Sequence, residues 1–282
     1  MIEGVFGAAS LRERRSRAGP FPVLRVAEWE SAHPGLVAGT TALELGDTEG
    51  SRDRVGERRT PPHDFRLDSP EGVPAVLERY LLLARHLGFD AAAVPRQVHG
   101  TRVVWVSGTR IDGVEVPAGA DGLLSRTPGV LLAVTVADCV PVYVVEPSRG
   151  LASLVHAGWR GTAARVLREA VGALERDAGA PATDLLMHLG PAICGRCYEV
   201  GPEVLAALGY RDSLPRPVDL RSELEREAIS LGLRRERISR SELCTRCGPE
   251  PLHSHRGRGI QSGRQAAFLG WSHHGGLQRR AM

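Results

Sequence analysis

The chain has 282 residues, of which 42% are hydrophobic and 24% are charged, as in a globular protein that can bury a sizeable core. Its formal net charge of +3 is too small to indicate a general nucleic-acid-binding protein, and no run of about 18 apolar residues predicts a membrane-spanning helix. Five cysteines are not a disulfide scaffold, so we expect reduced thiols or metal ligands in a cytoplasmic protein.

The N-terminal part of the chain carries the weakest pattern. Residues 1–35 are expected to be a partly flexible extension, in which the arginine cluster from Arg12 to Arg17 forms a flexible arm. The polar stretch 46–72 contains Gly and Pro and predicts a loop. An amphipathic helix is predicted to follow over residues 73–89, ending near Gly88.

The remainder of the chain alternates between predicted strands and helices. From Thr101 to Val155, short apolar runs are separated by Gly and Pro, which is typical of β-strands. The expected strands cover residues 101–106, 121–125, 130–137, 140–146, 151–157, 184–190 and 266–271. The expected helices cover residues 161–179, 201–209 and 221–233. This order favours one α+β domain, residues 1–282, around a central sheet layer.

The apolar run from Val130 to Pro147 carries two residues that a buried strand does not need, Asp138 and Cys139. An unpaired carboxylate is costly to bury, so Asp138 must have partners. Two interpretations stay open. The carboxylate either orients a ligand histidine or acts as a general base, or it caps the strand end by accepting backbone N–H groups.

Three predicted strand ends carry potential metal ligands, namely His99 in RQVHG, Cys139 in ADC and His156 in LVHAGWRG. Two imidazoles and one thiolate, with a fourth position open, suit a catalytic zinc ion. Neighbouring strands lie about 5 Å apart, so the ends of successive strands can bring Cys139 and His156 together. On the spacing alone, ordinary structural roles for these residues stay open.

The other cysteines form two pairs, Cys194-x-x-Cys197 and Cys244-x-x-Cys247. Such pairs can bind structural zinc. The stretch between them is longer than in common zinc ribbons and contains two predicted helices. We therefore expect neither a second metal site nor a disulfide, although a non-catalytic zinc protein built around these pairs stays open.

Several stretches, in order, resemble the laccase-domain family, also called multicopper polyphenol oxidase-like. They are RQVHG, ADGLLSRTPGVLLAVTVADCVPVYVVEP, LVHAGWRGTAARV, LGPAICGRCYEVG, LCTRC and HSHRGRGIQSGRQAAFLGW. The resemblance runs from about Pro95 to Trp271, whereas LVAGTTALELGD at residues 36–47 lacks an arginine that the family usually has there. Bacterial members of the family are described as purine nucleoside phosphorylases and as peptidoglycan editing factors.

The resemblance implies a fold, a cofactor and a reaction. The fold would be a β-sandwich of mixed sheets flanked by helices, related to bacterial toxin deamidases that use a Cys–His pair. The metal ligands would be His99, Cys139 and His156, with zinc as the cofactor and copper possible. The implied substrates are phosphate and a purine nucleoside, namely adenosine, inosine, guanosine or methylthioadenosine, and adenosine would also be deaminated. We expect a monomer or homodimer.

Roles for further residues follow from these reactions. In deamination, Asp138 would shuttle protons. In phosphorolysis, Arg96 and Arg160 would hold phosphate or donate to the departing base. Gln97, Ser254, His255, Arg256 and Arg264 are the expected substrate-binding residues.

Two other chemistries follow from the same residues. A thiol amidohydrolase acting on a cell-wall precursor would use Cys139 as nucleophile and His156 as base. A true multicopper oxidase needs many more imidazoles than one site with two histidines and one cysteine supplies.

Overall fold

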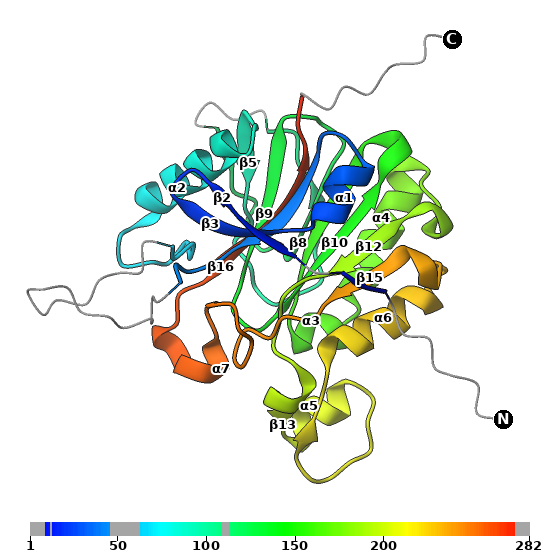
Figure 1. Cartoon of the computed structure of the whole chain (residues 1–282). Coiled ribbons are helices and arrows are strands. Elements are labelled where there is room, and N and C mark those ends of the chain that lie inside the picture. The colour runs from blue at the N-terminus through cyan, green and yellow to red at the C-terminus, as the bar shows by residue number, and fades with distance from the viewer. Residues whose placement is uncertain (1–8, 12, 46–62, 109–112, 274–282) are drawn as a thin grey trace, which may run out of the picture.

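Two seven-stranded β-sheets form the centre of the molecule, and helices cover their outer faces (Figure 1). The structure is a computed structural model that describes residues 9–11, 13–45, 63–108 and 113–273. It confirms the expected α+β class with mixed sheets flanked by helices. The kinship with toxin deamidases stays a prediction. Among the described helices, none is both long and apolar enough to cross a membrane.

The strands and helices have the following bounds. The first sheet, in the order β1-β15-β12-β10-β11-β8-β6, contains β1 (Ala9–Leu11), β6 (Val103–Trp105), β8 (Gly122–Ser125), β10 (Val140–Glu146), β11 (Leu151–Ala157), β12 (Leu186–Leu189) and β15 (Ile238–Ser241). The second, in the order β2-β3-β4-β16-β9-β5-β7, contains β2 (Arg14–Ala18), β3 (Phe21–Arg25), β4 (Leu36–Thr41), β5 (Ala91–Ala93), β7 (Val114–Glu115), β9 (Val130–Val136) and β16 (Gln265–Trp271). A small separate pair is formed by β13 (Glu199–Val200) and β14 (Arg216–Pro217). The α-helices are α1 (Ala27–Ala32), α2 (Val73–His86), α3 (Trp159–Ala163), α4 (Val166–Ala178), α5 (Pro202–Ala207), α6 (Leu220–Ser230) and α7 (His255–Arg258). The short 3-10 helices are η1 (Pro147–Arg149), η2 (Ala182–Asp184), η3 (Gly195–Cys197), η4 (Arg235–Arg237) and η5 (Gly259–Gln261).

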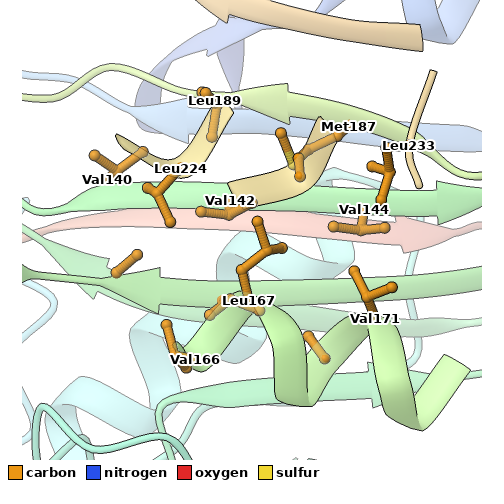
Figure 2. Packing of buried hydrophobic residues seen from close by; sticks show 14 of the residues in the cluster. Val140, Val142, Val144, Val166, Leu167, Val171, Met187, Leu189, Leu224 and Leu233 are labelled. Atoms are coloured by element: carbon orange, nitrogen blue, oxygen red, sulfur yellow. The ribbon is translucent and has the colours of Figure 1, made fainter. Parts of the chain in front are cut away.

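Strand β10 is buried on both faces, which explains why its residues before Glu146 are almost all apolar. Successive side chains of a strand point to opposite faces. Val142 and Val144 pack with Leu167 of α4 on the outer face of the first sheet (Figure 2). Tyr143 and Val145 point the other way, into the layer between the two sheets. A strand covered on both faces leaves polar groups mainly at its ends, which is where Glu146 and, just before the strand, Asp138 lie.

The outer face of the second sheet is covered by α2. Tyr80 and Leu83 of this helix are fully buried against Leu131 of β9 and Phe268 of β16. The Tyr80 hydroxyl donates to the backbone oxygen of Phe65 at 3.0 Å. Burying a leucine-sized side chain contributes about 1.5–3 kcal/mol. This face therefore fixes β9, which leads directly into Asp138 and Cys139.

The N-terminal segment contributes β1 to the first sheet and β2 to the second, which corrects the expectation of a flexible arm. Residues 14–18 form β2, which pairs antiparallel with β3, and β3 pairs with β4. Arg15 binds Glu250 at 2.5 Å, and Arg17 binds Glu44 at 2.8 Å. Residues 1–8 and 12 of the expected extension, and 46–62 of the expected loop, lie outside the described residues.

The helix expected over residues 161–179 is divided in two. Helix α3 ends at Ala163 and α4 begins at Val166. Between them, Arg165 has a φ of 68°, in the left-handed region that interrupts a right-handed helix. The strands expected over residues 140–146 and 151–157 have these bounds in β10 and β11, and the other expected elements are present with shifted ends, for example α2 over Val73–His86.

Candidate functional site

The structure brings His99, Cys139 and His156 together. Their ligand atoms all lie within 4.8 Å of one another. Cys139 precedes β10 and His156 lies near the end of β11, and the antiparallel register that aligns Pro141 with His156 sets these two ends side by side. His99 enters from the loop after β5, and its ring meets that of His156 edge-on at 4.8 Å between centroids.

The backbone around these ligands has an unusual conformation. His99 has a φ of 60° and Asp138 a φ of 87°, in a region that non-glycine residues rarely adopt and that concentrates at functional sites. Gly158 follows β11, and a Cβ there would lie 2.9 Å from the Cys139 Sγ and 3.4 Å from the His99 ring. The ligands therefore come this close because position 158 has no side chain.

A residue that the sequence reasoning missed, Asp121, holds two of the three ligands in position. Its buried carboxylate accepts the backbone N–H groups of Val98, His99 and Gly100 at 3.1, 2.9 and 2.7 Å. It also lies 2.9 Å from Nδ1 of His156. The sequence contained a signal for it, because Asp121 directly precedes the apolar strand β8, much as Asp138 comes shortly before β10.

The close contacts within this cluster shift the pKa values of Cys139, His156 and Asp121. Burial raises the pKa of the Cys139 thiol, but His156 and His99 outweigh burial and lower it to about 6. Burial lowers the pKa of His156, but the Cys139 thiolate and Asp121 outweigh it and raise the value to about 9. Burial also raises the pKa of Asp121, yet its hydrogen bonds from His156 and Gly100 leave that pKa below the ordinary value. Without a metal ion, the cluster is therefore a thiolate beside an imidazolium at neutral pH.

Two cavities meet at this cluster. The larger, about 620 Å³, is lined by the predicted residues Arg96, Gln97 and Arg264, together with Arg66 and the three candidate ligands. The Gln97 amide is bonded to Thr135 in both directions, donating to its carbonyl and accepting from its N–H and hydroxyl. Gln97 therefore fastens the loop that carries His99 to β9. The three arginines of the lining outnumber its one carboxylate, Asp68, and make the cavity cationic.

The smaller cavity, about 290 Å³, contains Asp138, Arg160 and Arg256. The Arg160 guanidinium lies 4.2 Å from the centroid of the Trp159 ring, and that of Arg256 lies 5.0 Å from the Tyr198 ring. The two cavities share four residues, His99, Ala137, Cys139 and His255. A molecule in either cavity would therefore touch the candidate metal centre.

Asp138 organises the loop around α7. Its Oδ1 accepts from the hydroxyls of Thr245 at 2.6 Å and Ser254 at 2.7 Å, and its Oδ2 accepts the backbone N–H of Arg256 at 2.5 Å. Asp121 is the carboxylate bonded to His156, so Asp138 does not orient this histidine, and its backbone contact with Arg256 is that of a cap. Ser254 is buried, caps α7 through Gly257 and lines neither cavity, unlike its predicted neighbours His255 and Arg256.

The sequence profile of the family described as multi-copper polyphenol oxidoreductase laccase matches residues 65–272. The chain belongs to this family. The match confirms the resemblance that the motifs indicated.

Named relatives and a solved structure agree with this membership in the laccase family. The chain is 32% identical over 254 residues to a protein named purine nucleoside phosphorylase YlmD from Geobacillus stearothermophilus, covering 84% of this chain and 90% of that protein. It is 34% identical over 208 residues to one named adenosine deaminase RL5 from an unknown prokaryotic organism, covering 67% and 79%. The crystal structure of YlmD from Geobacillus stearothermophilus matches with a TM-score of 0.76 at 28% identity, covering 93% of this chain and 99% of that one.

Proposed function

We propose that this laccase-family protein is a zinc-dependent purine nucleoside phosphorylase that also deaminates adenosine, and that it acts in the cytoplasm. One observation carries the proposal. His99, Cys139 and His156 converge where two arginine-lined cavities meet, so two substrates can approach one centre from different sides. The names of the relatives, purine nucleoside phosphorylase and adenosine deaminase, support the same reaction classes.

The donor set fits zinc. Two imidazoles and a thiolate are borderline-soft ligands that suit this ion and leave one coordination position open. Asp121 bonds to Nδ1 of His156, which leaves Nε2 for a metal and is the arrangement that supports ligand histidines elsewhere. Gly158 provides the space in which the ligands meet. A zinc ion held by these side chains would supply a Lewis acid at the junction of the cavities.

The protein's own residues divide phosphorolysis between the cavities. In this reaction, a phosphate oxygen forms a bond to C1′ of the ribose while the bond to the purine nitrogen breaks, and the electron pair leaves with the purine. Arg160 in the smaller cavity would bind phosphate, because its exposed guanidinium has no ion pair within the described residues and stacks only on Trp159. Arg96 in the larger cavity would donate to the departing purine.

Adenosine deamination needs a proton carrier beside the candidate metal centre, where the two cavities meet. Water adds at C6 of the purine and the amino group leaves as ammonia, so a proton must move between two atoms of the reaction centre. Asp138 lines the smaller cavity. Its Oδ1 already accepts two hydroxyls, whereas Oδ2 accepts only the Arg256 N–H and keeps one free lone pair. We propose Oδ2 as the atom that would carry the proton.

The test uses the purified chain loaded with zinc. Adenosine with phosphate is expected to give adenine and ribose 1-phosphate, and adenosine without phosphate is expected to give inosine and ammonia. His99→Ala should abolish both reactions, whereas Arg160→Ala should raise the KM for phosphate and leave deamination intact. If the zinc-loaded protein releases neither adenine nor inosine, the proposal is wrong.

A second candidate function rests on a different observation. Asp121, His156 and Cys139 form a chain of contacts in which a carboxylate orients an imidazole beside a thiolate, the arrangement of a thiol nucleophile with its base. This favours a thiol amidohydrolase acting on an amide of a cell-wall precursor. Metal removal separates the two candidates, because chelation would abolish the zinc-dependent reaction and leave an iodoacetamide-sensitive Cys139 hydrolase active.

A further inference from the structure

We infer that Cys194, Cys197, Cys244 and Cys247 bind a second zinc ion, which has a structural role. The four sulfur atoms all lie within 4.8 Å of one another, and those of Cys194 and Cys247 are 3.9 Å apart. Tetrahedral zinc with Zn–S bonds of about 2.3 Å places its sulfurs about 3.8 Å apart, whereas disulfide sulfurs lie at about 2.05 Å. The spacing of these side chains is therefore that of a tetrathiolate site.

One sulfur of the cluster is surrounded by hydrogen-bond donors. The Cys244 Sγ accepts the backbone N–H groups of Cys194, Arg246 and Cys247 at 3.3, 3.4 and 3.5 Å. A neutral thiol is a weak acceptor, whereas hydrogen bonds to an ionised acceptor are markedly stronger. Three backbone donors aimed at one sulfur thus indicate a thiolate, which is the form that binds zinc.

Both cysteine pairs form tight turns that aim their sulfurs to one side. In the first, the Cys197 N–H donates to the Cys194 oxygen at 2.9 Å. In the second, the Gly248 N–H donates to the Cys244 oxygen at 2.9 Å, and a Cβ on Gly248 would lie 2.5 Å from that oxygen. A glycine directly after the last cysteine is therefore required for the second turn to close.

The sheet explains how pairs so far apart in the sequence meet. Strands β12 and β15 are parallel neighbours in the first sheet (Figure 1). The segments that follow the two strands, which carry the two cysteine pairs, therefore leave the sheet at the same end. A further parallel bridge joins Ala192 to Cys244, and the Thr245 N–H donates to the Ala192 oxygen at 3.2 Å. The long intervening stretch, which counted against a metal site in the sequence, folds away as α5 and α6.

Cationic groups offset the charge of the cluster. Four thiolates and one Zn²⁺ carry a net charge of about −2, which needs nearby positive groups when it is partly buried. Each turn contains an arginine, Arg196 and Arg246, and Arg246 donates to the Cys197 oxygen at 3.3 Å. The buried Arg221 donates to the oxygens of Ser241 and Leu243, directly before Cys244.

The cluster adjoins the wall of the smaller cavity. Ile193 and Tyr198, which flank the first cysteine pair, both line that cavity. Thr245, within the second pair, donates to Asp138 at 2.6 Å, and the Ile193 N–H donates to the Asp138 oxygen at 3.1 Å. An ion that binds the two turns together would therefore hold this wall and Asp138 in one arrangement.

The experiment uses the full-length His99→Ala variant, purified with reductant and without added metal, so that only the cysteine cluster is intact. We expect about one zinc per chain, with an X-ray absorption spectrum of four sulfur neighbours at about 2.3 Å. In a parallel experiment, Cys247→Ser in the His99→Ala background should lose this zinc, and its exposed side chain makes this the mildest change to packing. Cys139→Ser is the matched control, since it removes a sulfur from the other cluster and should keep the all-sulfur zinc.

Three results would overturn the inference. The first is a His99→Ala protein that melts cooperatively but contains no zinc. The second is zinc with nitrogen neighbours, or iron in its place. The third is a thiol titration of the denatured protein, without reductant, that finds fewer than the five cysteines of the chain, because the missing thiols would then be disulfides. None of these readouts depends on the proposed nucleoside chemistry.

Discussion

Asp121 shows how a single residue can support the candidate metal centre without touching a substrate. Its carboxylate holds the His99 backbone and the His156 ring at once. Gly158 has the complementary role, because its missing side chain lets the Cys139 sulfur approach. Both residues act through the ligands, so changes at either should appear in metal affinity as well as in turnover.

The Asp121→Asn variant should bind zinc about 10–100-fold more weakly. An amide can still accept one hydrogen bond, but its NH₂ group faces N–H donors, so stability should also fall by about 1–3 kcal/mol. Competition with a chromogenic chelator measures the affinity, and urea unfolding measures the stability. Asp212→Asn, an exposed residue paired with Arg216, is the control. Unchanged zinc affinity in Asp121→Asn would contradict the supporting role.

The Gly158→Ala variant should lose zinc from the His99 cluster and about 1–3 kcal/mol of stability, since the new methyl group overlaps Cys139. Gly172→Ala is the matched control. Its Cβ would meet only the end of the Arg176 side chain within α4, so this helix should gain about 0.5–1 kcal/mol. Thermal unfolding and metal content report both effects, and equal behaviour of the two variants would refute the steric argument.

At the scale of the elements, the break between α3 and α4 concentrates strain in one residue. Arg165 has a left-handed backbone, a φ of 68°, which costs an ordinary residue about 1–2 kcal/mol. Arg165→Gly should therefore raise the free energy of unfolding by about 0.5–1 kcal/mol, the gain being reduced by the greater freedom of glycine in the unfolded chain. Arg168→Gly, within α4 itself, should lower it by about 0.5–1 kcal/mol. Denaturant titration distinguishes the two signs. Since Arg165→Gly also removes the ion pair of Arg165 with Glu227 at 4.0 Å, a loss larger than the roughly 1 kcal/mol of an exposed pair would show that the break is not strained.

The sequence predicted those elements whose own residue pattern determines their structure, and it missed those that form only through pairing with a neighbouring strand. Long apolar runs such as β9 and β10 were predictable, because burial on both faces leaves one pattern. The strand β2 was not, since its sequence RRSRA is charged and becomes a strand through pairing with β3. The three candidate ligands could be predicted because they follow or end apolar strands. The sequence pattern did not indicate a role for Asp121, and the long stretch between the cysteine pairs argued against their forming a site. Both depend on which strands are neighbours in space, which chain spacing does not reveal.

At the scale of the whole molecule, the buried side chain of His253 makes the stability of the fold depend on pH in acid. His253 is 1% exposed, between the segment of His63 and the start of β16, where its N–H donates to the Gln265 side chain at 2.9 Å. Burial, followed by the charges of Arg264 and Arg258, outweighs the His63 carbonyl and lowers the pKa of His253 to about 3. In the folded protein, the His253 ring therefore stays neutral down to a pH of about 3.

The sign of the pH effect follows from this shift. The pKa of a histidine in the unfolded chain is about 6.5. Below that pH the unfolded chain binds a proton at His253 that the folded chain does not. The contribution of His253 to the free energy of unfolding is therefore fully present above that pH and falls by about 1.4 kcal/mol per pH unit down to about pH 3. Between pH 7 and 5 the loss should be about 2 kcal/mol. His253→Gln and His253→Asn should flatten this slope, even if both start from lower stability, as measured by urea unfolding at each pH. A slope equal to that of the unsubstituted protein would rule out His253 as its source.

The shared boundary of the two cavities has a practical consequence for ligand design. Because both cavities are lined by Cys139, His99 and His255, one ligand can be designed to occupy both of them. With the function proposed above, a purine tethered to a phosphonate by a short linker would bind in both cavities at once, and the second contact would form at the high local concentration that the tether imposes. The tether length that gives the tightest binding would then measure the distance between the purine and phosphonate positions on either side of Cys139.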